Sequence, residues 1–386
     1  MNRTRANRLG DFFDTYTKDL KAQDLQRLFT HDTRDAYKFF TRGVDLEAFK
    51  KLPWHRRALA HARLLFMAFT MKLSPARRLV YGVALVSLAI GLLHLLEGVR
   101  IGSAAVGRVT IVFPGLAFPE GTFWLIAAFG LMNLLVLLEV ADRLSLKNDL
   151  EIAREIQQAM LPSGLYTAQG IETVGQSRPA NTVGGDFYDI LPLDDGRVVI
   201  TVGDVAGKGS PAALLMALLL AMLRTLVDEK LEPAELVARL NVQVCRHSPP
   251  SRFITLFYGV YQPLSGELTY VSAGHMPPLL VRYDGHCDRL TEGGIALGMF
   301  EQSAYRIAQI VLERGDLIAV YSDGITEAEN KSGRPFDEDG LTAALCAVRS
   351  QPIATIGPSV VRAVERHGGD TRFADDLTIL LLRRTG

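Results

Sequence analysis

The chain has 386 residues, of which 48% are hydrophobic and 22% charged, so a wholly disordered protein is excluded and two or three folded units are expected. The formal net charge is zero, but residues 1–78 hold 17 Lys and Arg against 8 Asp and Glu, whereas residues 149–386 hold 21 against 30. A basic front and an acidic back favour a membrane-adjacent segment followed by a cation-holding domain, and they exclude a general nucleic-acid binder, whose functional domain would be basic.

The first 78 residues are predicted to form a cytoplasmic, helical, basic segment. No apolar stretch follows the basic start, so we expect no cleavable signal peptide. Residues 58–73 are apolar with isolated cations, and they fit either a helix on anionic lipid or a helix packed in this segment. The sequence of residues 1–50 indicates no particular function.

Residues 79–140 are predicted to hold two transmembrane helices joined by a short external loop. Leu79–Leu96 and Gly121–Leu138 contain no Asp, Glu, Lys or Arg, and each has about 18 residues, the lower end of what spans a bilayer. The alternative is a pair of buried core helices. Residues 50–78 carry eight cations and no acidic residue, which places both chain ends in the cytoplasm. We therefore expect a multi-pass membrane protein whose C-terminal domain lies in the cytoplasm.

A charged linker helix is predicted over residues 141–162. Its apolar residues step by four, three, three and four, which is near the coiled-coil period over only two heptads: Leu146, Leu150, Ala153, Ile156 and Met160. Pro162 ends it. Homodimerisation through this helix is the natural route to an oligomer.

Residues 163–386 read as one mixed α/β domain. Strands are predicted at 197–205, 254–262, 266–273, 316–322 and 377–382, and helices at 210–229, 233–246, 337–349 and 353–366. Three distant cysteines without CxxC spacing indicate neither a disulfide framework nor a thiolate zinc site. GDVAGKG (203–209) is not a nucleotide-binding P-loop, because the required glycine and the Ser or Thr after Lys208 are both absent.

Acidic residues of this domain stand where strands meet turns. Asp186, Asp204 and Asp323 each adjoin a glycine, and the pair Asp375–Asp376 opens the last strand. A single such turn is usually only a turn. Four in one domain predict converging carboxylates that need cations, and oxygen ligands favour Mg²⁺ or Mn²⁺. Two such ions about 4 Å apart can share and acidify a water and clamp a phosphate.

At these residues the chain resembles the metal-dependent protein phosphatase (PPM) family, and most closely its bacterial branch, the sporulation stage II E and sigma-regulator phosphatases. The resemblance covers about residues 150–383, and six segments are similar to that branch's motifs in order: IAREIQQAMLP (152–162), RPANTVGGDFYD (178–189), GDVAGKG (203–209), SAGHMPP (272–278), YSDGITE (321–327) and ADDLTIL (374–380). It implies an α+β fold, an α-β-β-α sandwich of two antiparallel sheets with helices outside.

The resemblance also implies roles for particular residues. Asp204 would bridge two divalent cations, Mn²⁺ or Mg²⁺, and Asp186 with the carbonyl of Val205 would complete one site. Asp323 and Asp375 would complete the other, with Asp376 as the alternative to Asp375. Asp186, Asp204 and Asp323 are thus the expected catalytic residues, and Asp189 would lie behind the ligands.

The chain departs from some relatives at two points. Ala206 stands where some eukaryotic-type relatives have a histidine, a candidate leaving-group acid, and no phosphate-gripping arginine is evident. Lys208 fits either a phosphate contact or a solvated turn lysine. His275 fits either a catalytic role or a hydrogen-bonded structural one.

The resemblance implies a serine/threonine phosphatase whose substrate is a phosphorylated STAS-type anti-sigma factor antagonist in a partner-switching pathway. A membrane receptor or scaffold with an inactive phosphatase fold is the main alternative. A transporter or channel subunit ranks last, because acidic residues occur only at the edges of the predicted spans.

Overall fold

The computed structural model describes residues 73–97, 99–106, 109–116, 121–168, 170–249, 251–369 and 373–386, with isolated positions at 53, 63, 66–67 and 70–71. The chain divides into two compact units, residues 1–144 and 145–386. The division falls inside the predicted linker, 141–162. Nearly all of the predicted basic segment, including residues 1–50, lies outside the described residues.

The first unit contains a helical hairpin. Helix α5 (Pro75–Glu97) is followed by strands β1 (Val99–Val106) and β2 (Val109–Leu116), which pair antiparallel, and then by α6 (Gly121–Met160), whose last part belongs to the second unit. The predicted second span and the predicted linker are therefore one continuous helix of 40 residues. Small residues bring α5 and α6 together, because a Cβ at Gly91 would lie 2.8 Å from the Leu125 side chain.

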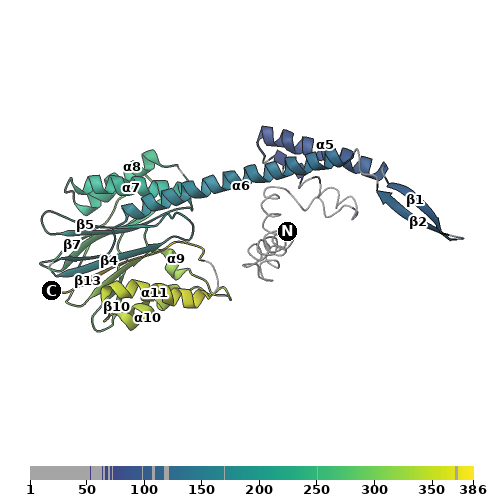
Figure 1. The fold of residues 1–386 in the computed structure, drawn as a ribbon. Helices are drawn as coiled ribbons and strands as arrows, with labels where there is room; N and C mark the ends of the chain where they lie inside the picture. Colours follow the sequence, from purple (N-terminus) through teal and green to yellow (C-terminus); the bar gives the residue numbers. More distant parts are fainter. Residues whose placement is uncertain are drawn as a thin grey trace, which may run out of the picture. The chain divides into compact units, whose positions relative to one another are not determined.

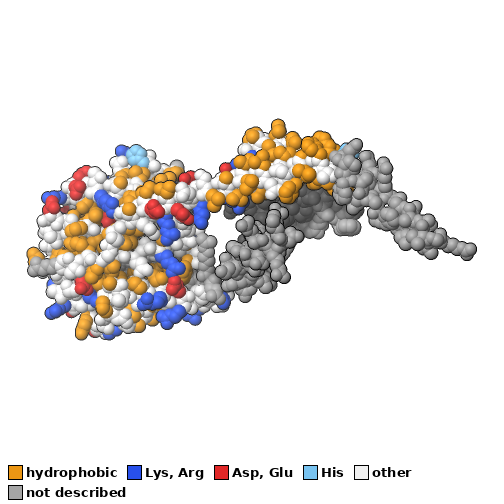
Figure 2. All heavy atoms as spheres, in the orientation of Figure 1, with side chains coloured by type: hydrophobic (Ala, Val, Ile, Leu, Met, Phe, Trp, Pro, Cys, Tyr) orange, Lys and Arg blue, Asp and Glu red, His pale blue; other side chains and the backbone are white. Residues whose placement is uncertain are grey.

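Three described helices are long and apolar enough to cross a membrane: α5, α6 and α7 (Ser210–Val227). Helix α7 is accounted for by the core of the second unit, since Ala212, Met216 and Leu219 are completely buried against it. Helices α5 and α6 expose large apolar side chains, and Figure 2 shows such side chains spread over their visible faces. Leu79 and Phe129, for example, are 69% and 71% exposed.

The second unit is built on two antiparallel sheets (Figure 1). One has six strands in the order β10-β9-β12-β13-β4-β3, and the other has five in the order β11-β8-β7-β6-β5. The strands are β3 (Leu165–Ala168), β4 (Ile171–Arg178), β5 (Phe187–Pro192), β6 (Val198–Val205), β7 (Ile254–Gln262), β8 (Glu267–Ala273), β9 (Leu279–Val281), β10 (Cys287–Arg289), β11 (Ala308–Val311), β12 (Leu317–Tyr321) and β13 (Leu377–Arg384).

Helices cover the outer face of each sheet. The five-stranded sheet is covered by α7 and α8 (Pro233–His247), and the six-stranded sheet by α10 (Asp337–Val348) and α11 (Ile353–Gly368) (Figure 1). Between the sheets lies a third apolar layer that includes Ile200, Phe257 and Leu380. This arrangement confirms the predicted α-β-β-α sandwich, and all five predicted strands and four predicted helices are present.

Strand register gathers the acidic turns. In the five-stranded sheet Phe187 pairs with Gly203, so the start of β5 lies beside the end of β6. In the six-stranded sheet Tyr321 pairs with Ile379, so the end of β12 lies beside the start of β13. The short helix α9 (Asp323–Thr326) begins two residues after β12.

Candidate active site

The structure brings the predicted carboxylates together from four segments. Asp186 precedes β5, Asp204 lies in β6, Asp323 begins α9, and Asp375 and Asp376 precede β13. Asp186 and Asp204 approach closely enough for one carboxyl, when protonated, to donate a hydrogen bond to the other. Asp323, Asp375 and Asp376 act electrostatically on Asp204. The predicted convergence of these side chains is therefore present.

Burial and mutual repulsion disfavour the ionised forms. The pKa of Asp204 is raised to about 6, chiefly by burial and then by Asp323. Burial first, and Asp204 second, raise the pKa of Asp186 well above its ordinary value. The pKa of Asp323 is also raised, by burial and by Asp375. A group of carboxylates arranged in this way needs positive charge before all of its members can ionise near neutral pH.

The residues present fit a divalent cation at Asp186 and Asp204. Asp186 is 4% exposed, and its Oδ2 is buried without a hydrogen-bond partner. The carbonyl oxygen of Val205 is directed at the same turn, since a Cβ at Gly185 would lie 2.9 Å from it and 3.4 Å from Asp204 Oδ1. Oxygen donors of this kind suit Mg²⁺ or Mn²⁺. Within the described part of the chain, no three acidic, histidine or cysteine side chains form a ready-made metal cage.

Asp376 differs from its neighbour because backbone amides already use its oxygens. Its Oδ1 accepts from the Ala180 amide and its Oδ2 from the Gly185 amide, both at 2.8 Å. Its own carbonyl accepts a hydrogen bond from the Ser322 hydroxyl at 3.2 Å. Asp376 thus joins the Asp186 turn to the end of the six-stranded sheet. Asp375 accepts one described backbone amide, at its Oδ1, and its side chain is 41% exposed, so it is the more accessible of the pair to a cation.

Lys208 lies across the site from the β6–α7 turn. Its Nζ is 2.7 Å from Asp375 Oδ2 and donates to the Ala374 carbonyl at 2.6 Å, while its side chain stays about half exposed. Neither sequence interpretation included this ion pair. Lys208 is thus ion-paired with Asp375, a residue predicted from the sequence to be a cation ligand.

His275 and Asp189 lie outside the carboxylate group. His275 is 7% exposed, its Nδ1 is 3.0 Å from the Thr255 hydroxyl, and burial lowers its pKa to about 4. Thr255 pairs with Asp204 in the sheet, so the imidazole supports the strand that carries Asp204. Asp189 lies three residues along β5 from Asp186 and forms an ion pair with Arg224 at 2.7 Å.

Sequence reasoning missed two side chains that fix the Asp186 turn. Gln157 of α6, 6% exposed, donates to the Gly184 carbonyl at 2.8 Å and accepts from the Gly184 amide at 3.1 Å. Arg224 donates to the Met160 carbonyl at 2.6 Å while it pairs with Asp189. The end of α6 is thereby joined to the turn. A glutamine or arginine on a helix gives no sequence signal for such a contact.

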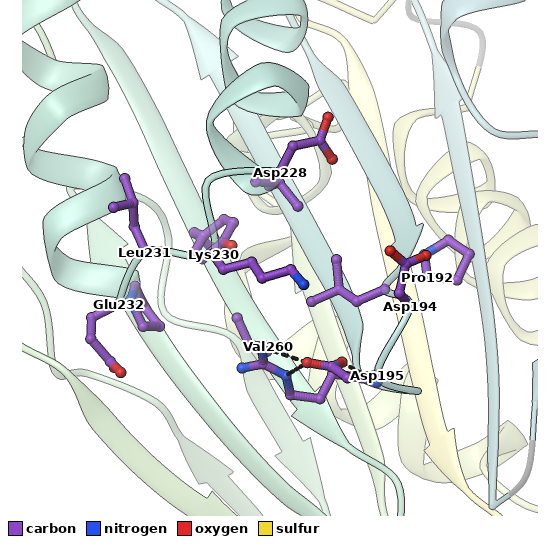
Figure 3. Close-up of a pocket in the computed structure, with 13 residues that line it drawn as sticks. Pro192, Asp194, Asp195, Asp228, Lys230, Leu231, Glu232 and Val260 are labelled. Carbon is purple, nitrogen blue, oxygen red and sulfur yellow. Dashed lines mark hydrogen bonds and ion pairs between the residues drawn. The ribbon is translucent and has the colours of Figure 1, made fainter.

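One cavity of the second unit lies away from the carboxylate group. It has a volume of about 370 Å³ and includes residues after β5 and between α7 and α8 (Figure 3). Asp194, Asp195 and Lys230 point into it, and Asp195 is paired with Arg197 (Figure 3). None of the predicted site residues lines it.

Comparisons with known proteins agree with this geometry. The sequence model described as "Stage II sporulation protein E (SpoIIE)" matches residues 194–385. Phosphoserine phosphatase RsbU of Bacillus subtilis (strain 168) is 30% identical over 243 residues, covering 62% of this chain and 71% of that protein.

Two solved structures share the fold. The RsbU and RsbW domains of Rv1364c from Mycobacterium tuberculosis match at 29% identity and a TM-score of 0.51, covering 56% of this chain and 60% of that one. The SiaA-PP2C domain of Pseudomonas aeruginosa matches at 22% identity and a TM-score of 0.56, covering 63% of this chain and 98% of that one.

Proposed function

This chain belongs to the stage II sporulation protein E family of PP2C-type phosphatases, and on that premise we propose that it is a membrane-anchored, Mg²⁺- or Mn²⁺-dependent enzyme acting on a phosphorylated STAS-type anti-sigma factor antagonist. As a protein serine/threonine phosphatase it hydrolyses a phosphoserine or phosphothreonine ester. The observation that carries the proposal is the approach of Asp186 to Asp204, with Asp323 and Asp375 acting on the same group.

The ligand assignment follows the family resemblance, and the buried Asp186 Oδ2 without a hydrogen-bond partner supports it. Asp204 would bridge two cations, with Asp186 and the Val205 carbonyl on one side and Asp323 and Asp375 on the other. When bound, two such cations supply Lewis acidity, which acidifies water and neutralises the phosphate charge. Asp376 holds the Asp186 turn in place through backbone amides.

The remaining residues have positioning roles. Thr255 and His275 support the strand of Asp204, and Asp189 with Arg224 supports β5. Lys208 would contact the phosphate once its ion pair with Asp375 opens. Ala206 leaves the leaving-group oxygen without a histidine acid at that position.

Membrane anchoring is supported by the first unit. Helices α5 and α6 have exposed apolar surfaces and contact each other through small residues such as Gly91. Arg77, at the start of α5, pairs with Asp142 of α6 at 2.8 Å, which places charge at one end of the helical hairpin. With the basic segment before it, this pattern favours two spans and a cytoplasmic catalytic domain in a bacterial inner membrane.

The partner is inferred from the family. RsbU is named a phosphoserine phosphatase, which favours a phosphoserine protein as substrate here. The resemblance of the motifs to sigma-regulator phosphatases favours a STAS-type antagonist among such proteins.

Control through α6 is part of the proposal. Gln157 contacts the turn of Asp186, and Leu146 and Ile156 on the same helix are 61% and 59% exposed. Homodimerisation along this helix would set the position of Gln157 and hence of the turn. A monomeric full-length protein as active as residues 150–386 alone would contradict this control.

The decisive experiment replaces the bridging carboxylate. Asp204→Asn should abolish Mn²⁺-dependent phosphate release from a serine-phosphorylated STAS protein while the thermal midpoint stays within a few degrees of wild type. Full activity of this variant would rule out the mechanism. Isothermal titration tests the alternative, an inactive receptor or scaffold: that alternative requires that wild type bind no Mn²⁺.

A further inference from the structure

Four large apolar side chains are exposed beside the carboxylate group. Phe253, Ile295, Met299 and Phe300 are 41%, 43%, 50% and 64% exposed, and we name them the apolar rim. They come from two segments that lie side by side, because Ile254 and Leu297 exchange backbone hydrogen bonds at 3.0 and 2.8 Å. A Cβ at Gly298 would lie 3.7 Å from Phe253 Cα. The two segments that carry the rim are therefore adjacent.

The rim is joined directly to the turn that follows Asp204. The Ala206 amide donates to the Phe253 carbonyl at 2.9 Å, and the Arg252 guanidinium donates to the Ala206 carbonyl. Gly207 has a φ of 109° and no side chain, and a Cβ there would collide with Arg252. The segment of Phe253 therefore lies against the turn that follows Asp204.

The segment that carries the rim is held in one conformation. The buried Asn241 of α8 donates to the carbonyls of Phe300 and Glu301 at 2.9 and 3.2 Å and accepts from the Gly298 amide at 2.9 Å. Arg246 pairs with Glu301 at 3.0 Å. The conformational entropy of this segment is thus lost during folding, so the binding of a partner costs little further ordering of the segment.

Clustered apolar side chains on a fixed frame mark sites of protein recognition. We propose that the apolar rim is the docking surface for the body of the phosphoprotein substrate, which covers it with apolar side chains around its phosphoserine. This inference rests on the proposed function. It predicts that the rim determines the affinity for the protein substrate and not the chemical step.

The test compares two substrates of the full-length protein in detergent. The double variant Met299→Ser/Phe300→Ser should hydrolyse p-nitrophenyl phosphate within about twofold of wild type. Its kcat/KM for a serine-phosphorylated STAS protein should fall about tenfold or more through KM, as loss of interface hot spots requires. The control is Leu264→Ser, which removes a side chain that is 80% exposed two residues beyond the far end of β7, a strand of 9 residues that spans about 27 Å from Ile254 to Gln262. It should match wild type on both substrates.

Each other outcome has a distinct meaning. If wild type releases phosphate from the STAS protein and the double variant does so equally well, the rim is not a docking surface. Equal losses on both substrates would show that the rim supports the site itself and would overturn the inference. A changed oligomeric state by size-exclusion chromatography, with KM unaltered, would assign the rim to a second copy of the chain. If wild type hydrolyses p-nitrophenyl phosphate but not the STAS protein, the proposed partner is wrong and this docking assignment is lost with it.

Discussion

Asp375 and Asp376 are adjacent acids whose replacement should affect different properties, cation binding for Asp375 and fold stability for Asp376. Asp376 is 7% exposed and accepts two backbone amides, whereas Asp375 is 41% exposed and contacts Lys208. We predict that Asp376→Asn destabilises the fold. Asp375→Asn should leave the fold intact and remove a cation ligand.

The magnitude follows from the hydrogen bonds. An amide at position 376 keeps one oxygen acceptor, but its NH2 group faces the N–H of either Ala180 or Gly185. One hydrogen bond to a charged acceptor is lost and a buried donor is left unsatisfied, which costs about 3 kcal/mol in the free energy of unfolding. For a unit of this size, that cost lowers the thermal midpoint by about 6–12 °C. Asp375→Asn changes a partly exposed ion pair and should shift the midpoint by about 2 °C or less.

Circular dichroism of residues 145–386 measures both midpoints, and Mn²⁺ titration calorimetry measures cation binding. Asp375→Asn should weaken Mn²⁺ binding at one site at least tenfold while its midpoint stays near that of wild type. If Asp376→Asn unfolds at the wild-type temperature but loses Mn²⁺ binding, and Asp375→Asn binds Mn²⁺ normally, the roles of the two acids are reversed.

Three further predictions test the surroundings of the site. Gln157→Leu leaves the amide and carbonyl of Gly184 buried without hydrogen-bond partners, so the free energy of unfolding should fall by about 2–4 kcal/mol. Amide hydrogen exchange at Gly184 should also become faster. An unchanged exchange rate would contradict the contact. His275 has a folded pKa of about 4 against an unfolded value of about 6.5, so its contribution to the free energy of unfolding is complete above pH 6.5 and is lost as the pH falls toward 4. Between pH 7 and 5, the free energy of unfolding of His275→Gln, measured in urea, should therefore fall by about 2 kcal/mol less than that of wild type. Equal falls in the two proteins would refute this prediction. Protons compete with cations at Asp204, whose pKa is about 6, so Mn²⁺ should raise the thermal midpoint more at pH 8 than at pH 5.5; an equal rise at both would exclude these carboxylates as ligands.

The long central elements could be predicted because their sequences have strong patterns. Strands such as β7 and β13 are mostly apolar runs and α11 is amphipathic, and their predicted ranges differ from the observed ones by only a few residues. The short strands β9, β10 and β11 have three or four residues each, too few for a period to be visible. Each forms by pairing with a neighbouring strand of its sheet.

The carboxylate positions could be predicted from turn chemistry and family motifs, but their division of labour could not. Asp375 and Asp376 are chemically identical in the sequence, and only the placement of the Ala180 and Gly185 amides distinguishes them. The same holds for Lys208, whose partner Asp375 is 167 residues away. Such contacts depend on tertiary structure, which local patterns do not encode.

Glycines 184 and 324 set a limit on how this protein can vary. A single methyl group at Gly184 would lie 2.2 Å from Asp376 Oδ2, and one at Gly324 would lie 2.0 Å from the Asp376 carbonyl. Random mutagenesis should therefore recover inactive alleles at these two positions from even the smallest replacement, alanine. Substitutions that change the metal or the partner are therefore expected at positions farther from Asp376, because a side chain at Gly184 or Gly324 would clash with that residue.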